Sequence, residues 1–300
     1  MKKNPLDTVG IVCGIVAFVM VIGSLVFLVR GMQGAWFPFR LPDFARMFRG
    51  EVDFDFGGGN VRDEGEERID AAITNLDVST VAGSISISGW SENYTLVRWV
   101  KTAPSQRALD NIAATIEARG DRLSVKRESL SQFGRRGTVI FEIFIPSGMQ
   151  RIAAKSVSGS VRLSGMPDGI DQDLGTTSGE IETDNAVDLE AASISGSIIF
   201  SFSGKVLQIK TVSGRIQGEI RDLGSGGSVK IHSVSGAVRL AAYPGLDARI
   251  NLHSVSGSVS SELPVTVTQS KRNRLEGTIG QGSIPLEVGT TSGSIRITKL

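Results

Sequence analysis

Residues 228–240 read SVKIHSVSGAVRL, and this stretch is the clearest copy of a pattern that the chain repeats. Val229, Ile231, Val234 and Gly236 are expected to point to one side, with a one-residue slip after Ile231. Alternation with a period of two is typical of β-strands that bury one side. The stretch therefore predicts two short strands joined at a serine–glycine corner.

The pattern recurs at a nearly fixed period. Its glycines are Gly83, Gly159, Gly179, Gly196, Gly214, Gly236, Gly257 and Gly293. If Gly277 marks a degenerate copy, seven steps cover the 134 residues from Gly159 to Gly293, about 19 per turn. A fixed period near 20 residues is the signature of a solenoid. We therefore expect an all-β fold, a parallel β-solenoid or β-helix in which Val and Ile side chains stack from rung to rung.

The glycine corner has a structural explanation. Glycine is expected there either because the backbone needs a positive φ or because a Cβ would collide across a thin core. The flanking serines are expected to face outward and to bond the local backbone. The repeated SVSG units are therefore interpreted as corners rather than as sites of serine nucleophiles.

An apolar run near the N-terminus predicts a membrane anchor. Residues 1–7 form a tail with Lys2 and Lys3, and residues 8–30 are apolar or small up to Arg30. About 20 such residues span the hydrocarbon core as a helix. A cleaved signal peptide is the alternative, but its apolar region is only about 7–15 residues long. We expect an uncleaved, single-pass transmembrane helix in the cytoplasmic membrane.

The flanks of the anchor leave its orientation open. Lys2 and Lys3 favour a cytoplasmic N-terminus and an extracytoplasmic solenoid, whereas arginines at positions 30, 40, 46 and 49 favour the opposite. Residues 31–69 combine an aromatic and basic juxtamembrane segment with an acidic, glycine-rich linker. The linker is expected to hold the solenoid domain, residues 70–300, away from the membrane.

The two ends of the solenoid are predicted to differ. A non-repeating insertion at about residues 91–150 predicts a strand–helix–strand cap, with an amphipathic helix that Ser105 begins and Gly120 ends. The other end finishes with ITKL, residues 297–300, without a polar cap. Because an uncovered rung is an open edge, self-association through the C-terminal rung is a further expectation.

Two polar groupings are candidate sites. The first is an acidic surface patch around one turn, formed by Asp171, Asp173, Glu180, Glu182 and Asp184. Calcium or carbohydrate chemistry would use such a patch, but Arg162 occupies the column of Glu182 and predicts a cross-rung ion pair. The second is His232 and His253, which share a template position on rungs that should be adjacent. Without a Cys or carboxylate beside them, they are interpreted as solvated corner residues rather than metal ligands.

The composition argues against several classes of function. The net charge is +1, and no basic stripe with interleaved aromatic residues runs along the repeats, so we expect no nucleic-acid binding. The only cysteine, Cys13, lies in the apolar run, which excludes a disulfide framework. We expect no catalytic residue, no metal and no cofactor.

Three stretches carry a resemblance to a known family. They are STVAGSISISGW at residues 79–90, the block that ends in IFIP at residues 143–146, and the serial SVSGSV units. Together they resemble the bacterial putative-adhesin domain family, a β-strand-repeat family of unknown function. The resemblance covers about residues 70–300, and it implies a β-solenoid with a non-enzymatic role at the cell envelope.

Three functions from different classes are compatible with these features. The first is a membrane-anchored envelope protein whose rigid solenoid binds an unknown envelope protein or a glycan. The second is a regulatory or scaffolding protein beside the membrane, of the kind that serves an envelope-stress system. The third, favoured least, is a polysaccharide-acting enzyme that would use the acidic patch.

Overall fold

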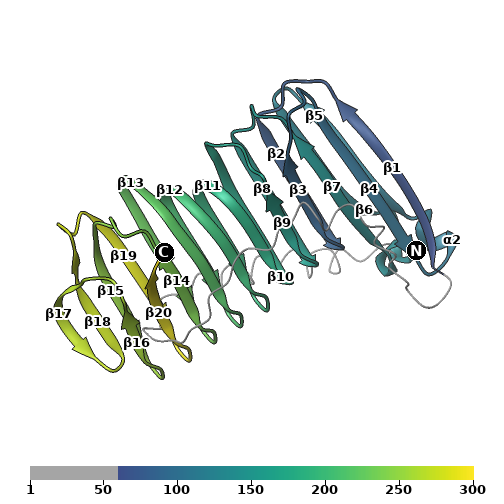
Figure 1. The fold of residues 1–300 in the computed structure, drawn as a ribbon. Helices are drawn as coiled ribbons and strands as arrows, with labels where there is room; N and C mark the ends of the chain where they lie inside the picture. Colours follow the sequence, from purple (N-terminus) through teal and green to yellow (C-terminus); the bar gives the residue numbers. More distant parts are fainter. Residues whose placement is uncertain (1–59) are drawn as a thin grey trace, which may run out of the picture.

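The computed structural model describes residues 60–300, which form a long stack of β-strands (Figure 1). The predicted tail, transmembrane anchor and juxtamembrane segment lie in residues 1–59, outside the described residues. No helix within residues 60–300 has the length and apolar character needed to cross a membrane.

Strands make up most of the described chain, so the fold is all-β as predicted. The elements in chain order are β1 (Val61–Ile69), β2 (Asn75–Ala82), β3 (Ile85–Gly89), β4 (Thr95–Ala103), α2 (Gln106–Leu109), β5 (Ile112–Arg119), β6 (Arg122–Ser129), the 3₁₀ helix η2 (Gln132–Arg136), β7 (Thr138–Ile145), β8 (Arg151–Ser158), β9 (Val161–Ser164), β10 (Ile170–Ser178), β11 (Ile181–Ser193), β12 (Ile198–Thr211), β13 (Ile216–Ser233), β14 (Val238–Ala242), β15 (Ala248–Ser254), β16 (Val259–Ser261), β17 (Thr266–Lys271), β18 (Arg274–Ile279), β19 (Ile284–Thr290) and β20 (Ile295–Lys299).

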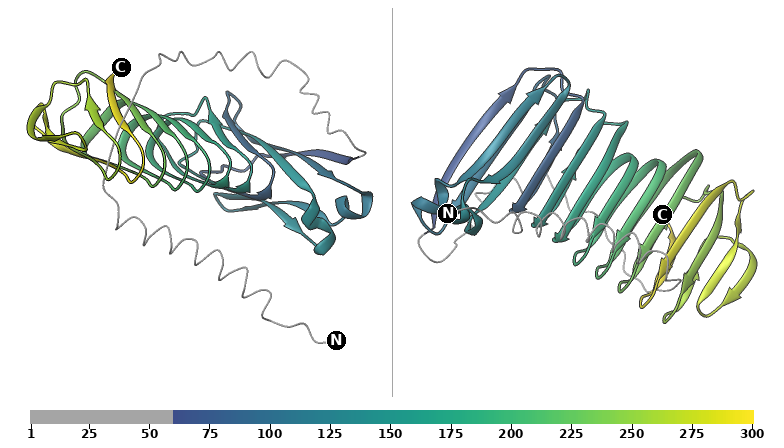
Figure 2. Two further views of the ribbon diagram at one scale, coloured as in Figure 1. Left: turned by 90° about the horizontal axis from the view of Figure 1, so that it is seen from below. Right: turned by 180° about the vertical axis from the view of Figure 1, so that it is seen from behind.

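The strands form two faces of one stack, which we call the first and second sheets (Figures 1 and 2). The first sheet has the order β5, β6, β2, β8, β10, the second halves of β11, β12 and β13, β19, β15, β18 and β17. The second sheet has the order β1, β4, β7, β3, β9, the first halves of β11, β12 and β13, β14, β20 and β16. The central strands pair in parallel, as a β-solenoid requires.

The core is the layer between the two sheets. One column of inward side chains consists of Val161, Ile181, Ile198, Ile216 and Val238, each 0% exposed. A strand spacing of about 4.8 Å brings such side chains into contact along the stack. Burial of each contributes on the order of 1.5–3 kcal/mol, and a rung obtains that burial only from its neighbours.

The spatial order of the rungs differs from the chain order at both ends. The β2–β3 rung lies between β6–β7 and β8–β9, and the C-terminal β19–β20 rung lies between β13–β14 and β15–β16. The prediction of an open C-terminal edge is therefore wrong, and that rung offers no free edge for self-association. The antiparallel hairpin β17–β18 ends the stack instead, because β18 pairs with β15.

The corner differs from the predicted register by one residue. Alternation continues from buried Ile231 to buried Ser233, and the apolar residue that follows does not enter the core. The equivalent residues Val81, Val157 and Val255 are 52%, 45% and 57% exposed. The buried hydroxyl column consists of Thr80, Ser156, Thr176, Ser193, Thr211, Ser233, Ser254 and Thr290.

At some corners the inward hydroxyl bonds the backbone of the neighbouring corner, whereas the hydroxyls of Ser193, Thr211, Ser233 and Ser254 have no hydrogen-bond partner among residues 60–300. Ser156 Oγ donates to the Gly83 carbonyl at 3.2 Å, and Thr176 Oγ1 donates to the Gly159 carbonyl at 3.2 Å. Valine has no donor and would leave such a carbonyl group without this bond. The first serine of each SVSG unit faces inward, whereas the second serine, next to the glycine, is exposed as predicted.

The repeat glycines approach the backbone of the next corner rather than the opposite side of the core. A Cβ on Gly236 would lie 1.9 Å from the Gly214 carbonyl oxygen, and one on Gly293 would lie 2.0 Å from the Gly236 oxygen. Equivalent distances at Gly159, Gly179, Gly196 and Gly214 are 2.1, 2.2, 1.7 and 2.0 Å. Gly83 has a second reason to be glycine, a φ of +121°.

The cap contains a strand where an amphipathic helix was predicted. Ser105 does begin a helix, but α2 has only four residues, and β5 follows it. Gly120, with φ +62°, forms the turn between antiparallel β5 and β6. Ile112 and Ile116 are β-branched and favour a strand once β6 offers a partner, which helical spacing alone does not reveal.

The end of the predicted linker is also a strand. β1 pairs with β4 along its whole length, and Arg98 Nε lies 3.0 Å from Glu66 Oε2. Lys101 Nζ lies 2.5 Å from Asp63 Oδ2. β1 therefore extends the second sheet, and basic residues of β4 pair with its acidic side chains.

Candidate binding surfaces

Charged side chains form rows on the outer face of the first sheet. Outward positions on successive strands are in register, so each row runs along the stack. One row is largely acidic and includes Asp77, Asp173, Glu190, Glu287 and Glu276. The adjacent row is largely basic and includes Lys126, Lys155, Lys210, His232, His253 and Arg274.

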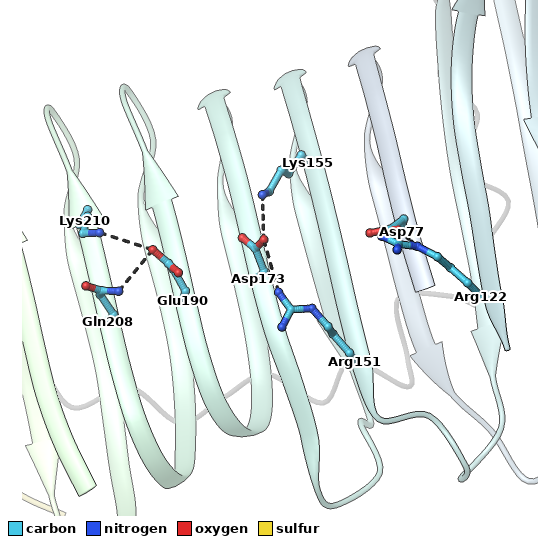
Figure 3. A network of polar contacts seen from close by, with 8 residues as sticks. All are labelled: Asp77, Arg122, Arg151, Lys155, Asp173, Glu190, Gln208 and Lys210. Carbon is cyan, nitrogen blue, oxygen red and sulfur yellow. Dashed lines mark hydrogen bonds and ion pairs between the residues drawn. The ribbon is translucent and has the colours of Figure 1, made fainter. Parts of the chain in front are cut away.

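Polar contacts between strands connect carboxylates of the acidic row with neighbouring side chains (Figure 3). Lys155 Nζ lies 2.8 Å from Asp173 Oδ2, and Arg151 Nη2 lies 3.9 Å from the same oxygen. The other contacts drawn join Asp77 with Arg122, and Glu190 with Lys210 and Gln208. Each of these carboxylates therefore already has a cationic partner within the protein.

The five residues of the predicted acidic patch are divided between the two faces. Asp171 and Asp173 belong to the first sheet, and Glu180, Glu182 and Asp184 belong to the second face and its corner. Arg162 Nε lies 3.2 Å from Glu182 Oε2, which confirms the predicted cross-rung ion pair. Asp184 accepts a hydrogen bond from the Gly165 amide at 2.9 Å, so it stabilises a corner. The five carboxylates do not converge on one site.

His232 and His253 share a row but are not on adjacent rungs. Gly289 of β19 stands between them in register, because the C-terminal rung intervenes. His253 is only 3% exposed, so the prediction of a solvated corner residue is wrong for it. Burial lowers the pKa of His232 below its usual value of 6.5, and nearby Glu287 opposes this shift. Within residues 60–300, no three or more His, Cys, Asp or Glu side chains gather in a way that could hold a metal ion.

A groove lies on the outer face of the first sheet, near the end capped by β17 and β18. Its volume is about 380 Å³, and β15, β17, β18 and β19 line it. Its polar groups include Arg249, Asn251, Glu276 and Glu287. Asn251 Oδ1 is inaccessible to solvent and has no hydrogen-bond donor among the described residues. The groove thus presents a guanidinium, an amide and two carboxylates on a rigid sheet.

The middle row of the second face changes character along the stack. At the β1 end its charges alternate, since Arg98 lies 3.0 Å from Glu66 and 3.8 Å from Glu142. Further along, Arg239 of β14 stands directly opposite Arg296 of β20. None of the hydrogen bonds or ion pairs within residues 60–300 involves the Arg239 side chain, and its Nε atom is inaccessible to solvent.

The cap exposes apolar side chains at the other end of the stack. Leu130 is 64% exposed, and Phe133 is 38% exposed with the Arg107 guanidinium 3.8 Å from its ring centroid. Buried Arg127 fixes this loop by donating to the Gly134 carbonyl at 2.7 Å, and desolvation lowers its pKa.

Sequence reasoning missed both the groove and the arginine pair. Alternation predicts correctly that Asn251, Glu287, Arg239 and Arg296 face outward. It does not predict that β19 brings Glu287 beside Asn251, or that β20 brings Arg296 beside Arg239. The sequence signal for the arginine pair was that Arg239 and Arg296 occupy equivalent positions of the repeat and carry the same charge.

The fold defines a two-faced parallel β-solenoid with an apolar interior and charged faces. The family model described as Toastrack DUF4097 matches residues 69–298, and the chain belongs to this family. The family assignment agrees with the resemblance seen in the repeats.

Several solved structures are similar to this chain at low identity. A "putative cell adhesion protein" from Clostridium sporogenes is 12% identical, with a TM-score of 0.39 over 80% of this chain and 100% of that chain. A "putative adhesin" from Bacteroides fragilis is 11% identical, with a TM-score of 0.36 over 79% and 97%. A "Putative lipid binding protein" from Parabacteroides distasonis is 14% identical, with a TM-score of 0.34 over 82% and 98%. No curated protein matches the chain.

Proposed function

We propose that this protein is a membrane-anchored, non-enzymatic protein of the bacterial cell envelope that binds a glycan through the outer face of its solenoid. The groove between β17, β18, β15 and β19 is the observation that carries the proposal. The apolar run at residues 8–30 supports the anchor, and the amino-terminal lysines support an extracytoplasmic solenoid.

The chemistry of the groove suits a ligand rich in hydroxyl groups. The Glu287 carboxylate can accept hydrogen bonds, and the Arg249 guanidinium and the Asn251 amide nitrogen can donate them, while Glu276 is paired with Arg274. Glu287, Asn251 and Glu276 follow one another on β19, β15 and β18, so their spacing is set by the sheet.

Binding can be tested on the full chain in detergent with envelope glycans and peptidoglycan fragments. Asn251→Ala should weaken binding of any glycan that the wild-type chain retains by tenfold or more. Gln208→Ala is the matched control, because Gln208 occupies the same outward row but contacts Glu190 outside the groove. A full screen without a binding glycan, or equal losses in the two variants, would contradict the groove assignment.

The location of the solenoid can be tested separately. Ser225 is exposed in β13 and accepts a single cysteine once Cys13 is replaced. Labelling of intact cells with an impermeant maleimide should modify this cysteine if the solenoid is extracytoplasmic. Modification only after lysis would place it in the cytoplasm and exclude an external glycan.

A second candidate is a membrane-side regulatory or scaffolding protein. Exposed Leu130 and Phe133 favour it, since apolar side chains at a tip are suited to contact with a membrane protein. β1 begins at this same end, because Val61 pairs with Ala103 just before α2. Replacement of both apolar residues by Ser should then abolish co-purification of a membrane partner, while Val267→Ser at the opposite end should not.

A further inference from the structure

The pairing of Arg239 with Arg296 is unusual for the row in which it occurs. Like charges directly opposite on neighbouring strands repel each other, and the rest of this row avoids that arrangement. Arg162, for example, has Glu182 opposite it on the next strand. The two arginines instead stand directly opposite each other on strands whose backbones are about 4.8 Å apart.

The immediate surroundings do little to neutralise the charge of Arg239. The outward neighbours on the same two strands are Ala237, Ala241, Ser294 and Thr298. Ser260 of β16 stands opposite Arg296 on the other side, and Glu262 Oε1 lies 3.6 Å from the Arg296 guanidinium. Glu262 therefore pairs with Arg296, whereas none of the ion pairs within residues 60–300 involves Arg239.

Arg239 in particular has a hydrogen-bond donor without an acceptor. Its Nε is inaccessible to solvent and finds no acceptor among residues 60–300. A guanidinium that is partly desolvated and without a carboxylate is costly to maintain, and a bound anion would offset that cost.

We propose that Arg239 and Arg296 form a binding site for a phosphate group carried on a ligand. A carboxylate has two oxygens and is satisfied by one guanidinium fork, whereas a phosphate has enough oxygens to accept from two forks. The site lies on the opposite face from the groove, so it adds a second ligand class to the proposed binding function. A polymer phosphate and a lipid headgroup share this chemistry, and the experiment separates them.

The test uses the purified full chain in a non-ionic detergent and three probes. Isothermal titration with inorganic phosphate, linear polyphosphate and monomeric dihexanoyl phosphatidylglycerol reports the isolated anion, the polymer and the lipid headgroup. Arg239→Gln and Arg296→Gln remove one charge each. Arg162→Gln is the matched control, because this arginine lies in the same row and is paired with Glu180 and Glu182.

We expect at least one probe to bind, and to bind tenfold or more weakly to R239Q and R296Q. R162Q should stay within twofold of wild type. A preference for polyphosphate assigns the site to a polymer, and a preference for the lipid assigns it to a headgroup. No binding of any probe at millimolar concentration, or an equal loss in R162Q, would overturn the proposal.

Thermal unfolding gives a readout that separates binding from a merely structural role. In phosphate-free buffer R239Q should melt at the same temperature as wild type or higher, because it removes a like-charge contact. The binding probe should raise the wild-type melting temperature but not that of R239Q. A lower melting temperature for R239Q without any probe would assign Arg239 a structural role. Because the titration does not depend on cellular location, its failure is distinct from a failure of the proposed envelope function.

Discussion

The carbonyl oxygen of Gly214 lies so close to Gly236 that a Cβ on Gly236 would be only 1.9 Å away from it. The same hypothetical Cβ would lie 3.0 Å from Ser233 Oγ. The buried hydroxyl column and the glycine column meet in the same way at Gly196, Gly214 and Gly293. The corners of this chain share a pattern in which Ser or Thr is followed three residues later by Gly. These two contacts explain that pattern where both occur.

A methyl group at Gly236 should destabilise the protein strongly. Gly236→Ala requires one rung to move away from the next, and overpacking of this kind costs about 1–3 kcal/mol or more. Chemical denaturation of the purified chain measures the effect. Gly148→Ala is the control, because a Cβ there meets nothing within 4 Å, and it should change stability by less than about 0.5 kcal/mol. Equal stability of the two variants would contradict the observed corner packing.

Two valines of one rung distinguish the observed register from the predicted one. Val161 is 0% exposed and Val157 is 45% exposed. Val161→Ala should cost about 1.5–3 kcal/mol, whereas Val157→Ala should cost well under about 1 kcal/mol. The predicted register placed both valines inward and requires similar losses. Denaturant midpoints of the two variants decide between the registers.

Disulfide trapping can test the insertion of the C-terminal rung. Lys230 is in register with Glu287 on the adjacent strand, while Asn251 lies one strand beyond. Lys230→Cys with Glu287→Cys should form a disulfide, since parallel neighbours about 4.8 Å apart are within bridging distance. Lys230→Cys with Asn251→Cys should not, because two strand spacings are about 9.6 Å. Mobility on a non-reducing gel, after replacement of Cys13, reports the disulfide. The reverse result would mean that the rungs are stacked in the order in which they occur in the sequence.

His232 should make stability depend on pH below neutrality. Burial lowers its pKa in the folded state, Glu287 opposes the shift, and Lys210 and Lys230 add to it. The unfolded chain keeps a value near 6.5 and binds more protons as the pH falls below it. The His232 contribution is therefore fully present above about pH 6.5 and is lost on acidification.

His232→Gln isolates this effect from other titrating groups. The difference in unfolding free energy between wild type and variant should be constant above about pH 7 and should shift in favour of the variant towards pH 5. Parallel denaturation curves at several pH values measure it. A difference that does not change with pH would mean that the folded and unfolded pKa values of His232 are equal.

Several features of the structure follow from the sequence alone. Alternation is a property of the extended backbone, so inward positions such as Ile231 and Val238 can be read from the pattern. A period near 20 residues gives the length of a turn, and the column shared by Arg162 and Glu182 gives a correct ion pair. These features depend either on a single strand or on two copies of the repeat that are neighbours both in the sequence and in the stack.

Other features depended on the tertiary structure. All rungs carry nearly the same pattern, so the pattern cannot say which two will pair, and the chain places its last rung between β13–β14 and β15–β16. That insertion separates His232 from His253, builds the groove around Asn251 and brings Arg296 beside Arg239. The corner register also escaped prediction, because valine is the more apolar residue, yet the inward corner positions hold Ser or Thr. The sequence alone determined the faces of each strand, and the order of the rungs decided which side chains meet.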